Sequence, residues 1–158
     1  MTEPTQRAAA RTHSLARPRQ GQAMMVAGRA SNYGVLCGRY IVAAGAFADL
    51  VRRGTRPKML LNHEGPEIGH WLTVSDDERG LFVTGWLWDN PRAVEAIQLF
   101  NDGCLTGLSL GPKGAVWDAM RCGIRILTEV NRIDEISLVG EPGDPAALIT
   151  EFAIGAGL

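Results

Sequence analysis

The chain has 158 residues, with 16 Lys and Arg against 17 Asp and Glu, and a formal net charge of −1. Hydrophobic residues make up 46% and charged residues 21%, which argues against a fibrous or largely disordered chain. A near-neutral charge argues against specific nucleic-acid binding, since phosphate contacts need a cationic excess. No membrane-length apolar run and no secretion signal are evident, so we expect a soluble intracellular or intra-particle protein.

Two features bear on domain organisation. Residues 1–22 are basic, polar and poor in large apolar side chains, and we interpret them as a flexible basic N-terminal arm ahead of one domain at residues 23–158. The three cysteines are odd in number and have no C-x-x-C spacing, which predicts neither a disulfide framework nor a zinc ribbon. Reduced thiols in a reducing compartment are the simpler interpretation.

The first half of the chain is divided by glycines and prolines into short segments, which is typical of many short strands. Strands are predicted at Ala23–Ala30, Tyr40–Val42 and Lys58–Asn62. Helical spacing of apolar residues predicts a short helix over Ala46–Arg53, ended by Gly54.

A hairpin and a helix follow. Strands at Ile68–Val74 and Leu81–Trp88 flank a polar loop, and the second strand has apolar groups on both faces, so we expect it to be covered on both sides. Asp89 or Asn90 can cap a helix that has Pro91 at its first position.

The rest of the chain again predicts strands, with Gly111-Pro112 interrupting the first of them and the last segment fitting helix or strand. These segments are 105–110, 115–117, 124–130, 133–139 and 146–154. The pattern favours a mainly β fold, an antiparallel barrel or sandwich decorated by helices.

The segment His63–His70 contains two histidines and two carboxylates. Its histidines are seven residues apart and Gly65-Pro66 breaks any helix, whereas the zincin motif needs them four apart on a helix. A metallohydrolase built on His63, Glu67 and His70 is therefore the most distant alternative, and we expect no metal and no cofactor.

Ser109 lies between Gly107 and Gly111 in a G-x-S-x-G pattern. The nucleophile elbow of an α/β-hydrolase requires a helix directly afterwards, which Pro112 and Gly114 prevent. Taken alone, a serine between glycines is usually structural.

Two carboxylates, Asp134 and Glu135, stand at the head of an apolar strand. With the two-residue period of a strand, Glu135 shares a face with Ser137. A half-buried carboxylate there needs a partner, and a histidine facing it would be one.

The three motifs, taken together in their order along the chain, resemble a known family, although each motif alone is weak evidence. Asn62-His63, Gly107-Leu108-Ser109-Leu110-Gly111 and Asp134-Glu135-Ile136-Ser137-Leu138-Val139 together resemble the prohead (capsid maturation) proteases of tailed phages and gene transfer agents. The resemblance runs from about Gly28 to Ala147 and includes landmarks near residues 28–31, 44–47, 80–83 and 102–103.

This resemblance implies a small antiparallel β-barrel with surrounding helices, similar to the herpesvirus assemblins, and serine endopeptidase activity. By matching motifs, Ser109 is the nucleophile, His63 the base and Glu135 the third triad member. Assemblins, which this family resembles, stabilise the oxyanion with a loop shortly after the third triad member. The corresponding loop in this chain is 140–144, and it contains no Arg.

The implied role is cleavage of the scaffold segment of the major capsid protein, and of the protease itself, inside the procapsid in the host bacterial cytoplasm. Assemblins act as dimers, so the resemblance implies a homodimer or higher self-association. The four tryptophans either face a partner or fill the core. The alternative is a non-catalytic capsid-assembly or scaffold module on the same barrel, with Ser109 and His63 retained only structurally.

Overall fold

The computed structural model describes residues 22–156, so the predicted arm lies outside the described residues except for Gln22, which opens the first strand. Within that range no helix is long and apolar enough to cross a membrane. The elements in chain order are β1 Gln22–Asn32, β2 Leu36–Cys37, β3 Tyr40–Val42, α1 Ala48–Arg53, β4 Lys58–Leu61, β5 Glu64–Asp77, β6 Gly80–Leu87, α2 Pro91–Asn101, β7 Gly107–Arg121, β8 Ile124–Val139 and β9 Ile149–Ala156.

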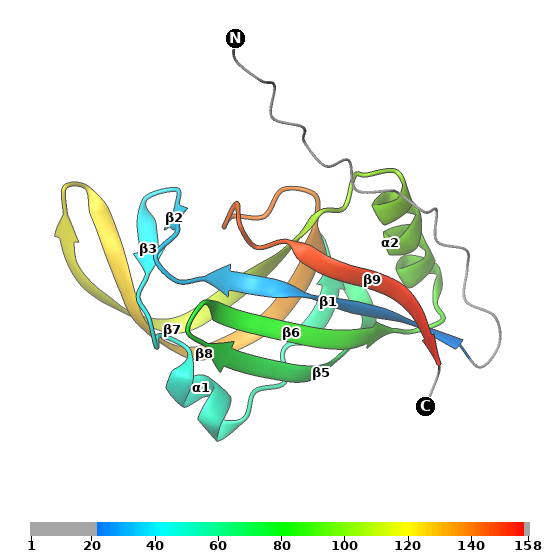
Figure 1. Cartoon of the computed structure of the whole chain (residues 1–158), viewed down its shortest axis with the longest axis horizontal. Helices are drawn as coiled ribbons and strands as arrows, with labels where there is room; N and C mark the ends of the chain where they lie inside the picture. Colours follow the sequence, from blue (N-terminus) through cyan, green and yellow to red (C-terminus); the bar gives the residue numbers. More distant parts are fainter. Residues whose placement is uncertain (1–21, 157–158) are drawn as a thin grey trace, which may run out of the picture.

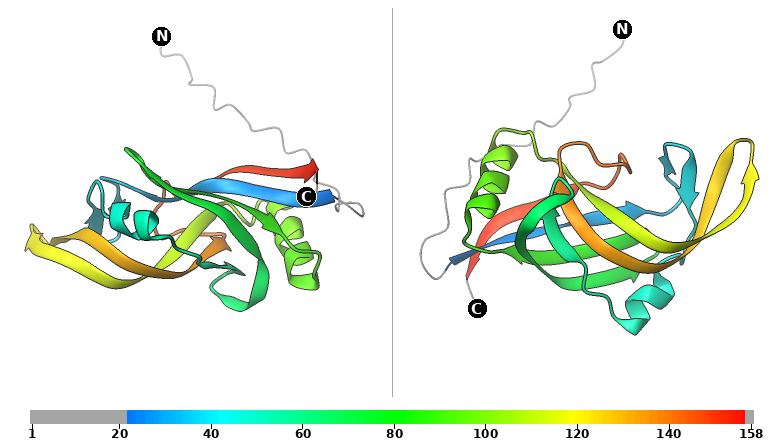
Figure 2. Two further views of the ribbon diagram at one scale, coloured as in Figure 1. Left: turned by 90° about the horizontal axis from the view of Figure 1, so that it is seen from below. Right: turned by 180° about the vertical axis from the view of Figure 1, so that it is seen from behind.

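The strands form one nine-stranded sheet in the order β2-β3-β8-β4-β5-β6-β1-β9, with β7 paired to β8 outside this path. The sheet curls into a half-barrel, and the long β7–β8 hairpin projects from one end of it (Figures 1 and 2). The prediction of a mainly β, barrel-like fold is confirmed. Most pairs are antiparallel as predicted, but β3 and β4 each run parallel to β8.

The two ends of the curl meet around Leu148. This residue bridges Gly107 at the start of β7, and its carbonyl accepts a hydrogen bond from the Arg29 amide of β1 at 3.2 Å. The Ile149 amide donates to the Thr106 carbonyl at 3.0 Å. The segment before β9 therefore joins β1 to the start of β7, close to Ser109.

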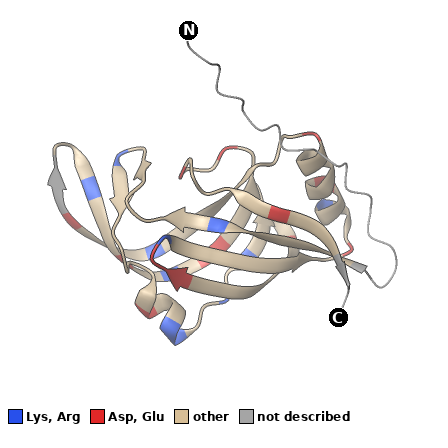
Figure 3. Ribbon diagram, viewed as in Figure 1, with Lys and Arg blue, Asp and Glu red and all other residues tan. Residues whose placement is uncertain are grey.

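The inner side of the curl holds the apolar core, with Phe47, Met59 and Leu61 among its fully buried side chains. Helix α2 lies at one end of the sheet, and its predicted cap is confirmed: the Asn90 side chain accepts a hydrogen bond from the Ala93 amide at 2.8 Å. Lys, Arg, Asp and Glu are interspersed over the described elements (Figure 3).

Three predicted strand breaks are wrong. Strand β7 runs through Gly111-Pro112, where the register shifts; because β7 is paired there on one side only, a proline without an N–H is tolerated. Strand β8 is likewise continuous from residue 124 to 139. Gly65-Pro66 falls inside β5, within an irregularity of the β4–β5 ladder. The segment 146–154, which fitted either helix or strand, forms a loop followed by strand β9.

Candidate active site

His63 occupies a tight left-handed turn between β4 and β5. Leu61 pairs with Glu64 across the hairpin, which leaves Asn62 and His63 as the two central residues, with φ of 52° and 64°. Positive φ at both central positions is the geometry of a type I′ hairpin turn, and Asn and His adopt it more readily than most residues. The Asn62 amide donates to the Leu138 carbonyl at 2.9 Å, which ties the turn to the end of β8.

Glu135 receives a hydrogen bond on each carboxylate oxygen. His63 Nδ1 lies 2.7 Å from Glu135 Oε1, and the hydroxyl of the fully buried Ser137 donates to Oε2. The Glu135 side chain is 17% exposed and the His63 side chain 46%. A carboxylate held this way keeps the proton of a neutral His63 on Nδ1, so Nε2 carries the free lone pair that a general base needs.

Ser109 lies on the face of the β7–β8 ladder that also carries Glu135. It pairs directly with Ser137 across the antiparallel ladder, and paired residues point to the same side. Ser137 in turn contacts Glu135. Among the described residues, no hydrogen bond joins Ser109 to His63. In many substrate-free enzymes the hydrogen bond between nucleophile and base is long and tightens only when the substrate binds.

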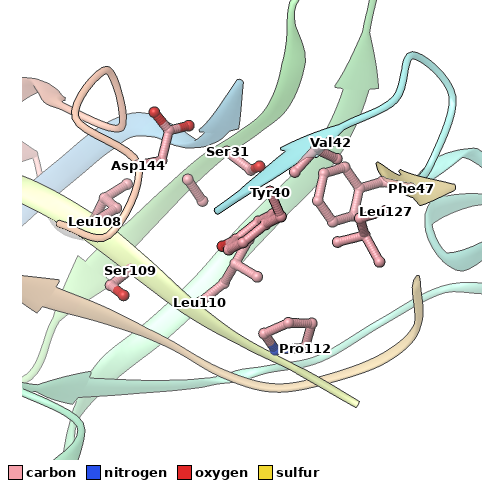
Figure 4. Close-up of a pocket in the computed structure, with 11 residues that line it drawn as sticks. Ser31, Tyr40, Val42, Phe47, Leu108, Ser109, Leu110, Pro112, Leu127 and Asp144 are labelled. Carbon is pink, nitrogen blue, oxygen red and sulfur yellow. The ribbon is translucent and has the colours of Figure 1, made fainter. Parts of the chain in front are cut away.

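A small pocket lies on the opposite, inner side of β7. Figure 4 shows Leu108 and Leu110 on the pocket side with Tyr40, while the Ser109 side chain points away from them. The pocket has a volume of about 30 Å³, room for one or two waters. Ser109 itself borders this pocket, but its hydroxyl points to the other face of β7, the face of the ladder that carries Glu135 and its partner His63.

The two glycines that flank Ser109 have separate steric roles. A Cβ at Gly107 would lie 2.6 Å from Pro142 Cγ and 2.7 Å from the Ala147 carbonyl oxygen, so only glycine lets the loop after β8 pack against β7. A Cβ at Gly111 would lie 3.1 Å from Glu135 Oε1. The two glycines thus make room on either side of Ser109, Gly107 for the loop after β8 and Gly111 for the Glu135 carboxylate.

The loop after β8 is anchored by Asp144, which is 8% exposed. One of its oxygens accepts hydrogen bonds from the Asn32 amide at 2.7 Å and the Asn32 side chain at 2.9 Å, and the other from the Ala146 amide at 2.9 Å. The Thr106 hydroxyl donates to the Gly140 carbonyl at 2.8 Å. The segment 140–144, expected from the resemblance to serve the oxyanion, is therefore held beside the strand that carries Ser109.

The residues of the metal alternative do not come together. His63 contacts Glu135, whereas His70 Nδ1 accepts a hydrogen bond from Trp88 Nε1 at 3.0 Å. Over residues 22–156 no group of three or more His, Cys, Asp or Glu side chains gathers around a possible ion position.

Sequence reasoning missed several side chains that shape the site. The strand period places Ser137 on the same face as Glu135, and this two-residue spacing was a usable signal for the hydrogen bond that the structure shows between them. Asn32 and Asp144, 112 residues apart, carried no local signal at all.

The chain belongs to the caudovirus prohead serine protease family, whose model matches residues 14–154. This confirms the family that the three motifs predicted. No curated protein matches the chain in sequence.

Two solved structures are similar in fold. The KSHV protease in complex with a hexapeptide phosphonate inhibitor is 15% identical, with a TM-score of 0.48, over 73% of this chain and 59% of that one. The varicella-zoster virus protease is 15% identical, with a TM-score of 0.49, over 73% of this chain and 57% of that one. The chain thus spans less than two thirds of the length of either viral protease.

The geometry distinguishes the two adjacent carboxylates. Glu135 contacts His63, whereas Asp134 Oδ1 lies 2.7 Å from Arg132 Nε on the exposed side of β8. We expect Glu135→Gln to lower kcat by about 10⁴-fold through loss of the correct His63 tautomer, and His63→Ala to lower it further. Asp134→Asn is the matched control and should retain wild-type kcat in the same peptide-cleavage assay. A wild-type rate for Glu135→Gln together with a loss in Asp134→Asn would reverse the assignment.

Proposed function

We propose that this protein is a serine endopeptidase of procapsid maturation, with Ser109 as nucleophile, His63 as general base and Glu135 as the residue that orients it. The observation that carries the proposal is the His63–Glu135 hydrogen bond on the face of the sheet that presents Ser109. Membership of the prohead serine protease family supports the reaction class. The substrates are the scaffold segment of the major capsid protein and the protease's own chain, inside the procapsid in the host cytoplasm.

The reaction is acyl transfer. As Ser109 Oγ attacks the scissile carbonyl carbon, His63 Nε2 accepts the hydroxyl proton and then gives it to the leaving amine, which departs as the peptide C–N bond breaks. Water, deprotonated by the same nitrogen, next attacks the carbonyl carbon of the acyl-enzyme ester. The bond to Ser109 Oγ then breaks, His63 Nε2 returns the proton to Oγ, and the product leaves as its carboxylate. Through both steps Glu135 holds Nδ1–H and stabilises the imidazolium, while Ser137 holds Glu135.

Substitution of the nucleophile tests this proposal. Ser109→Ala removes one oxygen from a half-buried side chain and should leave thermal unfolding unchanged, while cleavage of the capsid protein falls by on the order of 10⁴ to 10⁶-fold. The measurement is in vitro processing of purified capsid protein, followed by mass spectrometry of the products.

Ser75→Ala, which removes an exposed strand hydroxyl bonded to the Phe82 carbonyl, is a matched control and should process normally. Processing by Ser109→Ala at the wild-type rate would remove Ser109 from the mechanism and favour the non-catalytic assembly module.

We also propose self-association of the chain as a homodimer. Among the four tryptophans, Trp71, Trp86 and Trp117 are half-buried, and Trp117 packs against Tyr40 and beneath the Arg125 guanidinium. Trp88 is 44% exposed, and its ring is tilted by 32° to that of His70, with the centroids 6.3 Å apart. The tryptophans therefore do not simply fill the core, and Trp88 is the one that a partner surface would cover.

Self-association predicts that specific activity rises with protein concentration, because dimer formation follows mass action. Sedimentation velocity over a concentration series, with cleavage rates measured in parallel, checks this. A constant specific activity from a protein that stays monomeric throughout would contradict it. Trp88→Ser should shift the transition to higher concentration.

A further inference from the structure

Arg92, the second residue of α2, extends toward the turn that carries His63. Its side chain is 23% exposed, and its Nε is buried without a hydrogen-bond partner. Leaving a buried donor unpaired is unfavourable, so the position of this guanidinium is set by its other contacts. Those contacts lead to both flanks of the β4–β5 turn.

The guanidinium spans the turn at its base. Arg92 Nη2 donates to the Leu61 carbonyl at 3.4 Å and lies 3.8 Å from Glu64 Oε1. Leu61 and Glu64 are the pair that closes the turn. Arg92 Nε also lies 3.6 Å from where a Cβ on Gly65 would be, so the side chain packs over the next residue of β5. One side chain therefore contacts the residues immediately before and after Asn62-His63.

Helix α2 is itself fixed to the same strand. The Asn90 side chain donates to the Glu67 carbonyl at 3.2 Å while capping the helix through the Ala93 amide at 2.8 Å. Arg92 Nη1 is held by Glu95 Oε2 at 2.6 Å, one turn further along the helix. The guanidinium thus reaches the turn from a short, well-anchored helix terminus.

We infer that Arg92 is a positioning residue for His63. Positive φ at two adjacent non-glycine residues is unfavourable, and such a conformation persists only when surrounding contacts determine it. The Asn62 amide is fixed from the β8 side, and Arg92 fixes the β4–β5 side. Without Arg92, the turn relaxes and the His63 ring loses its orientation toward Glu135.

A lysine does not replace this arrangement. The planar fork places Nη1 on Glu95 while Nη2 reaches Leu61, whereas a single ammonium cannot serve both at these separations. The exposed Glu64 contributes little to the interaction, because ion pairs with solvent-exposed carboxylates are weak. The hydrogen bond to the Leu61 carbonyl and the packing over Gly65 are the contacts that matter.

The test combines kinetics with NMR of the His63 ring. Arg92→Met keeps an unbranched stem without donors and should lower kcat by on the order of 10 to 100-fold, with KM nearly unchanged. In long-range ¹H–¹⁵N spectra, the two His63 nitrogens of the neutral wild-type ring should show one tautomer. In Arg92→Met they should move toward averaged values. Arg92→Lys should be intermediate in both measurements.

Arg52→Met is the matched control, because Arg52 forms the equivalent i,i+3 pair with Asp49 on α1, away from the turn. It should leave both measurements at wild-type values. Unchanged His63 nitrogen shifts in a folded Arg92→Met variant overturn the inference, whatever the rate. If Arg92→Met does not fold, Arg92→Lys decides, and wild-type kcat with wild-type shifts overturns it.

The kinetic part rests on the proposed function, but the NMR part does not. A wild-type protein without peptidase activity whose His63 shifts still respond to Arg92→Met would retain the positioning role and refute the endopeptidase proposal. The two failures are therefore distinguishable.

Discussion

The hydrogen bond between His63 and Glu135 joins residues 72 positions apart, and much of the surrounding structure serves to make it possible. His63 must sit in a left-handed turn whose two flanks are held from β8 and from α2. Glu135 must lie on the outer face of β8, steadied by Ser137 from below and given space by Gly111. The hydrogen bond thus depends on the relative positions of the β4–β5 turn, strand β8 and strand β7.

Strand β8 provides that register. It pairs with β7 along nearly its whole length, and in parallel with β4 through Lys58–Leu61. Pairing with this one strand therefore fixes the positions of both Ser109 and the start of the His63 turn. Ser109 is fixed opposite Ser137, and Leu61 is fixed beside Leu138. A one-residue slip in either ladder would turn Ser109 inward or move the turn away from Glu135, because side chains alternate between faces.

Much of the local structure was predictable from the sequence. The Asn90 cap with Pro91, the Gly54 helix end and the β5–β6 hairpin follow from short-range rules that operate within a few residues. The continuous strands β7 and β8 were not predictable, because Gly111-Pro112 reads as a break until it is known that one side of β7 has no partner there. The same holds for the parallel pairing of β3 and β4 with β8, which is a long-range property.

The three candidate site residues were identified through the order of their motifs, and the structure adds how they are supported. A half-buried carboxylate on an apolar strand indicates that Glu135 needs a hydrogen-bond partner. That this partner is His63 depends on the position of the β4–β5 turn, which lies far away in the sequence. Arg92 was missed because an arginine early in a helix is ordinarily a solvated residue, and only the folded chain places it against Leu61 and Gly65.

The most direct test of the account is labelling with a fluorophosphonate, which reacts covalently with an activated serine. Peptide mapping of the labelled wild-type protein should find one adduct, on Ser109, and His63→Ala should not form it, because the hydroxyl then has no base to take its proton. An adduct at a different serine, or equal labelling of Ser109 with and without His63, would contradict the account.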